Sequence, residues 1–305
     1  MLCHQFSKSP DLEKIIAVDI QTMPAILKDN KKIIWITADL TEKIWRIPAL
    51  VNKPEVVIHC AWGMKDLNIS RVVFEFCFQN SFIKKLIYLS DTVAYGAYSE
   101  NAVERPFTET DELKEEEIPS GSLKKAIESE LRDQYEASDK GKRVSVLRTV
   151  SIVGPRGRSL ETKNSLPFFP VGSSKWCKQF VHEDDITDAI AMFTFGGRDS
   201  KGCYEVYNLA PNDAVVAEEI ARVVKKPLIK IPPLFMRFAC YLAWSLSGGK
   251  IPTPVGAWRS FCYLIPVDGS AVTGDHGFEY FYNSHDALTK DEGRYAESFN
   301  RCEAA

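Results

Sequence analysis

Three aspartates stand directly after short apolar segments and are the first candidates for chemistry in this chain. Asp19 ends the segment IIAVD, Asp39 follows IIWITA, and Asp91 follows KLIYLS, with the hydroxyl of Thr92 beside it. A carboxylate in such a position can accept hydrogen bonds from the hydroxyl groups of a ligand or act as a base. We therefore expect a ligand site built from residues that follow strands.

The elements that would position these residues alternate along the chain. β-Branched apolar runs predict buried strands at 14–20, 31–37, 55–61, 85–90 and 143–149. Apolar residues at helical spacing predict helices between them, at 67–80 and 121–140. This alternation predicts an α/β fold with a doubly wound, Rossmann-like parallel sheet, in which ligands bind at the carboxyl ends of the strands.

The character of the chain changes near residue 150. We expect a nucleotide-binding domain over 1–150 and a smaller, mainly helical substrate-binding part over 151–305. Helices are predicted at 180–193, 214–226 and 232–247, and a strand at 203–210. The segments 180–193 and 203–210 are expected to return to the first sheet.

Composition excludes some classes of function. A net charge of −3 and a pI of about 6.0 lack the basic field that a nucleic-acid-binding protein needs. The eight cysteines show no metal-ligand spacing, so we expect no metal site and reduced thiols in a cytoplasmic protein.

The most apolar segment is 231–246, which contains Arg237. It is shorter than the roughly 20 residues that a membrane-spanning helix needs, so a packed helix is predicted and membrane contact is not expected. An amphipathic surface over 231–264 that lies in the plane of a membrane is the alternative.

A series of motifs resembles the extended short-chain dehydrogenase/reductase superfamily, which includes NAD-dependent epimerases and dehydratases and 3β-hydroxysteroid-dehydrogenase-like proteins. The series, which covers roughly residues 10–290, is IIAVDI, TADLTE, VVIHCAWG, YLSDTVAYG, LRTVSIVGPRGRS, FVHEDDITDAI and YEVYNLA. No motif is specific alone, but their order and spacing match the family.

The resemblance implies NAD as cofactor and assigns roles to particular residues. Asp19 would bind the adenosine ribose and favour NAD over NADP, because a carboxylate repels a 2′-phosphate. Asp39 and Leu40 would approach the adenine, the backbone at Ala61 and Trp62 would pass the cofactor, and Lys124 would hold the nicotinamide ribose.

Three departures from the family pattern bear on activity. The chain lacks the first strand and its Gly-rich turn, which cradles the pyrophosphate, so the central strand of the sheet is expected to be missing. The catalytic Tyr-x-x-x-Lys motif reads Ser120-Gly-Ser-Leu-Lys124, and a serine hydroxyl is a far weaker acid than a phenol. The supporting Ser/Thr position is Asp91, with Thr92 adjacent as a substitute.

Several residues allow two interpretations. Lys124 is either the cofactor ligand or a surface lysine paired with Glu128, and Tyr95 either replaces the missing acid or lines the pocket. Arg156 and Arg158 either clamp a phosphate or carboxylate of the substrate or lie in solvent. Ser120 or Ser122 is expected to cap the helix over 121–140.

We interpret the chain as an NAD-dependent epimerase/dehydratase-like oxidoreductase of a hydroxyl or ketone substrate, impaired by the lost Gly-rich turn and tyrosine. The alternative is a pseudoenzyme, a non-catalytic binding or scaffold protein that keeps the fold. The substrate is either apolar or a sugar nucleotide. Family analogy predicts a homodimer formed through the helices at 67–80 and 121–140.

Overall fold

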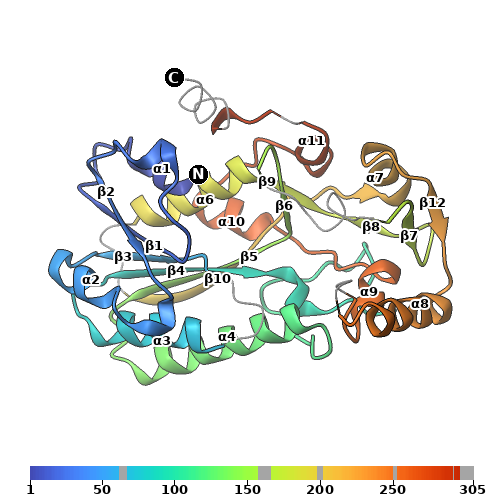
Figure 1. The fold of residues 1–305 in the computed structure, drawn as a ribbon, viewed down its shortest axis with the longest axis horizontal. Coiled ribbons are helices and arrows are strands. Elements are labelled where there is room, and N and C mark those ends of the chain that lie inside the picture. The colour runs from blue at the N-terminus through green and yellow to red at the C-terminus, as the bar shows by residue number, and fades with distance from the viewer. Residues whose placement is uncertain (62–66, 157–165, 198–201, 250–252, 291, 296–305) are drawn as a thin grey trace.

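A computed structural model describes residues 1–61, 67–156, 166–197, 202–249, 253–290 and 292–295. Four parallel strands form the centre of the molecule in the order β10-β5-β4-β3 (Figure 1). Their bounds are Val56–His59 (β3), Lys85–Asp91 (β4), Arg143–Thr149 (β5) and Cys203–Leu209 (β10). All four lie in segments that the sequence predicted as strands.

Two further parallel strands, β1 (Ile15–Asp19) and β2 (Ile33–Thr37), pair only with each other. They nevertheless belong to the same layer as the four-stranded sheet. Ile15 of β1 and Ile58 of β3 contact the apolar core on one face, and Val18 and Val57 contact the core on the other. The α/β parallel-sheet fold is thus confirmed, and no described strand joins β1 to β3.

The backbone of this layer shows why β1 and β3 are edges. Ile15 donates its N–H to Lys32 of the β2 side, and the carbonyl of Glu55 accepts from Lys84 and Lys85 of the β4 side. Successive residues of a strand direct their backbone groups to opposite sides. The N–H and C=O groups of the alternate residues therefore point away from the partner strand, at Ile16 and Val18 in β1 and at Val56 and Ile58 in β3.

Helices cover both faces of the sheet. On one face α3 (Leu67–Gln79) and α4 (Pro119–Ala137) pack side by side, and on the other lies α6 (Glu183–Phe195), as Figure 1 shows. The alternation along β4 explains this: Leu86 and Tyr88 face α3 and α4, whereas Ile87 faces α6. Short elements before and between the strands are α1 (Leu2–Phe6), α2 (Arg46–Asn52) and the 3-10 turns η1 (Ala25–Leu27), η2 (Leu40–Glu42) and η3 (Thr92–Tyr95).

Besides α6 and β10, the described chain after residue 150 forms pairs of short strands and further helices. Strand β6 (Ser151–Val153) pairs with β9 (Phe180–His182), and β8 (Cys177–Lys178) pairs with β11 (Val215–Val216). Strand β7 (Phe169–Val171) pairs with β12 (Leu228–Lys230). The helices are α7 (Ala217–Val223), α8 (Pro233–Leu246), α9 (Ala257–Cys262), α10 (Ser270–His276) and α11 (Ser284–Thr289). From this half, β10 pairs with β5 in the four-stranded sheet.

The predicted cap of α4 was wrong. The helix begins at Pro119, with Ile118 as an extended N-cap residue and no side-chain capping bond, and Ser120 and Ser122 lie inside its first turn. Proline is favoured at that first position because its missing N–H would have no helical partner there. The start of α7 was also placed too early, because Val215 and Val216 form a short strand.

Candidate functional site

The carboxyl ends of β3 and β4 lie beside the first turns of α4, where Lys124 interacts with Asp91 and His59, whereas Asp19 and Asp39 lie at the ends of β1 and β2. Lys124 is the central one of these residues. It projects from α4 onto the end of β4, where its Nζ donates to the Leu89 carbonyl at 3.0 Å and lies 4.9 Å from the centre of the Tyr88 ring. The side chain is only 6% exposed, so the interpretation as a surface lysine paired with Glu128 was wrong.

Burial is the main influence on the ammonium of Lys124. It lowers the pKa of Lys124 below the ordinary value, and the negative charges of Asp91 and Glu128 oppose that shift. The Lys124 charge and burial together lower the pKa of the neighbouring His59 to about 3, burial contributing more. The ends of β3 and β4 therefore hold a single ammonium, beside a neutral His59 and the Asp91 carboxylate.

Glu128, one turn further along α4, is bound to Arg148 instead of Lys124. Arg148 Nη2 donates to Glu128 Oε2 at 2.7 Å, and Ser90 Oγ donates to Glu128 Oε1 at 2.5 Å, with all three residues buried. Burial opposes the charge of Arg148, yet the Glu128 carboxylate keeps the pKa of Arg148 above its ordinary value. This buried pair fixes α4 against β4 and β5, and with it the position of Lys124.

Tyr95 belongs to the same buried network. Its hydroxyl accepts from Arg148 at 2.7 Å and lies 2.9 Å from both the Thr108 carbonyl and Asn208 Oδ1, to which it can donate. Burial raises the pKa of Tyr95 to about 12. A fully buried phenol with three partners is poorly suited to exchange protons with a substrate, so the geometry favours a structural role for Tyr95.

The residue in the place of the expected tyrosine, Ser120, is half-buried in the first turn of α4, one turn before Lys124. Asp91 ends β4, and its Oδ1 accepts from the N–H of Val93 at 2.8 Å, which caps η3. Thr92 is buried within η3, which argues against its hydroxyl as the substitute at the supporting Ser/Thr position. Asp91 is half-buried, and its negative charge raises the pKa of Lys124.

The residues assigned to the adenosine side lie at the ends of β1 and β2. Asp19 is exposed, and its Oδ1 accepts from the N–H of Gln21 at 2.9 Å. Asp39 is exposed as well, and its Oδ1 accepts from the N–H and the hydroxyl of Thr41, both at 2.8 Å, which lowers the pKa of Asp39. Leu40 is half-buried against the core under α3.

Cys3 of α1 was not anticipated as a neighbour of this region. Burial raises the pKa of the Cys3 thiol, and the Asp19 carboxylate adds to the shift, which places α1 near the end of β1. The spacing of the cysteines in sequence gave no signal for this, because Cys3 lies in α1, outside every motif.

Other predicted residues are less informative. Ala61 is exposed two residues after the end of β3, whereas Trp62 and Arg158 lie outside the described residues. Arg156 is exposed, and its backbone N–H donates to Glu183 Oε2 at the start of α6. No cluster of possible metal ligands occurs in the described part of the chain.

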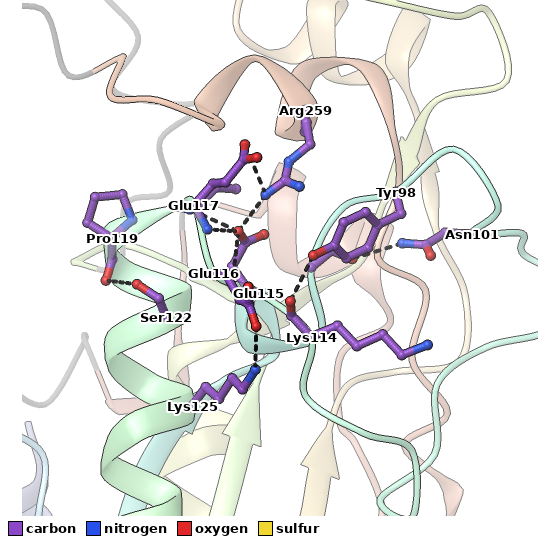
Figure 2. Close-up of polar contacts among 12 residues, drawn as sticks. Tyr98, Asn101, Lys114, Glu115, Glu116, Glu117, Pro119, Ser122, Lys125 and Arg259 are labelled. Carbon is purple, nitrogen blue, oxygen red and sulfur yellow. Dashed lines mark hydrogen bonds and ion pairs between the residues drawn. The ribbon is translucent and has the colours of Figure 1, made fainter.

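A second buried ion pair ties the C-terminal part to the site (Figure 2). Glu115 is fully buried just before α4, and its Oε1 accepts from the N–H groups of Glu117 and Ile118, both at 2.8 Å, and from Arg259 of α9 at 2.5 Å. Gly121 permits this packing, because a Cβ there would lie 2.5 Å from Glu115 Cγ. The turn that presents Ser120 is thus held by α9.

The described residues match NAD in part. Asp19 and Lys124 offer an acceptor and a donor of the kinds that bind ribose hydroxyl groups. No described glycine with positive φ follows β1, β2 or β3, so the described strand ends lack a turn of the kind that cradles a diphosphate.

Comparisons with known proteins give the fold a context. No protein-family model matches the sequence, and no curated protein matches it either. Solved structures do match: MoeE5 in complex with UDP-glucuronic acid and NAD has a TM-score of 0.69 and 18% identity, over 98% of this chain and 94% of that one.

Two epimerases are equally similar. The UDP-glucose 4-epimerase of Thermotoga maritima has a TM-score of 0.69 and 17% identity, with 98% of this chain and 95% of that chain covered. The UDP-Glc/GlcNAc 4-epimerase of Campylobacter jejuni has a TM-score of 0.70 and 15% identity, with 100% and 95% covered. The chain thus has the Rossmann-like fold of sugar-nucleotide epimerases and related enzymes, as the sequence motifs predicted.

Proposed function

We propose that this protein is a nucleotide-binding member of the NAD-dependent epimerase/dehydratase type, with its site at the carboxyl ends of β1, β3 and β4. The observation that carries the proposal is the placement of Lys124. Burying a lysine is costly, and here its ammonium is held on the Leu89 carbonyl beside the strand ends where ligands bind in such sheets.

NAD is the proposed cofactor, with Lys124 on the nicotinamide ribose and Asp19 on the adenosine ribose. The solved structures with this fold include complexes of NAD with UDP-glucose and with UDP-glucuronic acid, which supports a nucleotide sugar as the substrate class. When bound, NAD would supply the hydride acceptor for oxidation of a hydroxyl-bearing carbon. The imperfect match at the diphosphate predicts weaker binding than a complete Gly-rich turn would give.

A ligand screen by thermal denaturation tests this proposal. NAD should raise the midpoint of unfolding of the purified chain more than NADP does, since ligands that bind only the folded state stabilise it. Lys124→Met should abolish the shift. Lys125→Met is the matched control, because Lys125 lies next in the same helix and pairs with exposed Glu116. A folded wild-type chain that responds to neither nucleotide would overturn the proposal.

The alternative is a non-catalytic binding protein, and the environment of Ser120 and Tyr95 favours it. Ser120 is too weak an acid for the family's proton transfer, and Tyr95 is committed to the buried network around Arg148. This alternative predicts that nucleotides bind while no UDP-sugar is converted, in an assay of the sugar products that also detects redox-neutral epimerisation. Turnover by the wild-type chain at rates that Asp91→Asn reduces would instead favour the enzyme.

A further inference from the structure

The outer face of α8 carries more exposed large apolar residues than any other described element. Leu234 is 75% exposed, Phe235 65%, Phe238 61%, Tyr241 64% and Leu246 84%. The opposite face packs on α9 through Met236 and Cys240. The prediction of a packed helix was therefore correct for one face only.

The exposed residues form one face of the helix. Leu234, Phe238 and Tyr241 recur at intervals of four and three residues, which brings them into line on one side, with Phe235 and Leu242 beside them. Isolated apolar residues on a surface are ordinary, but a contiguous set of large ones marks an interaction surface.

The charge around this face is one-sided. From residue 220 to 267 the chain contains seven lysines or arginines and no aspartate or glutamate, although its overall net charge is −3. Arg237 lies exposed on α8 itself, and Lys230 is exposed at the end of β12, which leads into α8. Lys225, also exposed, precedes β12, and α7, β12 and α8 follow one another along one end of the molecule (Figure 1).

We propose that α8 docks onto the surface of an anionic lipid bilayer and lies in its plane. A helix with large apolar and aromatic residues on one face and basic residues at its flanks is suited to the boundary between acyl chains and headgroups. Basic residues close to the surface add attraction to anionic lipids. A membrane-spanning role is excluded for the described helices, none of which is long and apolar enough.

The geometry also explains why a lipid surface is favoured over a second protein chain. The face lies on a single helix of 14 residues at the end of the molecule, and it is bordered by basic side chains of one sign. A symmetric contact between two copies would bring Arg237 and Lys230 of each copy toward like charges, which disfavours self-association.

Co-sedimentation of the full chain with vesicles tests the proposal. The protein should pellet with vesicles of phosphatidylcholine and phosphatidylserine and stay in the supernatant with phosphatidylcholine alone. Phe235→Ser combined with Phe238→Ser should lower the partition coefficient at least roughly tenfold, because two exposed aromatic anchors are removed. Lys230→Glu should lower it at least roughly fivefold.

Matched controls distinguish docking through α8 from non-specific adsorption of exposed apolar residues. Ile47→Ser combined with Val51→Ser removes two exposed apolar side chains of α2, which are 65% and 75% exposed, and should leave vesicle binding unchanged. Wild-type protein that remains in the supernatant with both kinds of vesicle would overturn the proposal. So would a dimer, measured by analytical ultracentrifugation, that the Phe235→Ser and Phe238→Ser variant dissociates.

Discussion

Ser120 is the residue that most limits the chemistry of the site. It lies one helical turn before Lys124, where the resemblance expects a tyrosine, and the turn that presents it is fixed by Glu115 and Arg259. The buried ammonium of Lys124 would favour the ionised form of any acid placed beside it. Of the tyrosine and lysine that the family pattern pairs, this site therefore retains only the lysine, Lys124.

Ser120→Tyr should restore a phenol beside Lys124 and produce or increase turnover. We expect a rise of at least about 100-fold in the conversion of a UDP-sugar to product, since a positioned general acid–base contributes roughly that much or more. Ser122→Tyr, on another side of the same turn, is the matched control and should have no effect. Equal rates in the two variants would show that the position of the phenol is irrelevant.

His59 gives a prediction at the same scale. Its pKa is lowered to about 3 by burial and by Lys124, and its Nε2 lies 2.9 Å from Ser70 Oγ. The unfolded chain binds a proton at His59 near pH 6.5, whereas the folded chain does not until about pH 3. This group's contribution to stability is therefore complete above pH 6.5 and is lost progressively as the pH falls toward 3.

His59→Gln should reduce the loss of stability on acidification. Between pH 7 and pH 5 the wild-type chain should lose about 2 kcal/mol of unfolding free energy through this residue, and the variant should not. Urea denaturation at the two pH values measures the difference. An identical pH dependence in both proteins would mean that His59 is protonated in the folded state.

Local patterning predicted the elements well and their contacts poorly. Leu123, Ile127 and Leu131, whose spacing of four residues predicts one face of a helix, pack on the same core. The pairing of Glu128 with Arg148 could not be read from spacing, because it joins a helix to a strand across the sheet. Pairing of charged residues four apart, which predicted Lys124 with Glu128, is a rule for isolated helices. Here the buried Arg148 binds Glu128 in place of Lys124.

The Glu115–Arg259 pair is the element-scale link between the α4 turn and α9. Both side chains are buried, and removal of one partner of such a pair leaves an uncompensated charge. Glu115→Gln should lower the unfolding free energy by about 3 kcal/mol. Glu116→Gln, at an exposed residue in the same loop, should change it by less than about 0.5 kcal/mol. Chemical denaturation measures both changes. Equal changes would show that the buried ion pair contributes no more to the unfolding free energy than an exposed one.

At the scale of the whole molecule, the parallel sheet was predictable from the residues. The gap between β1 and β3, where the family has a central strand, was expected only from the resemblance. Five β-branched runs correctly indicated strands, because buried parallel strands are continuously apolar. The side on which each strand lacks a neighbour depends on pairing between distant segments, which composition does not encode. The motifs from β1 to β10 nevertheless identified the fold that the solved structures share.

The edges of β1 and β3 predict uneven protection from hydrogen exchange. Amide groups of β4, which is paired on both sides and buried, should exchange slowest. The amides of Ile16, Val18, Val56 and Ile58, which point away from the paired strands, should exchange much faster than their immediate neighbours. Mass spectrometry or NMR with residue resolution measures this, and uniform protection along β1 would mean that a strand covers its free edge.

The central claim is that a nucleotide binds at the carboxyl ends of these strands through Lys124 and Asp19. Isothermal titration calorimetry of NAD into the purified chain tests it most directly, with Lys124→Ala and Asp19→Ala beside the wild type. We predict measurable binding of NAD to the wild type that both substitutions weaken at least about tenfold, the scale of one lost charge-assisted hydrogen bond. Folded wild-type protein that releases no heat of binding, or variants that bind as well as it does, would contradict the account.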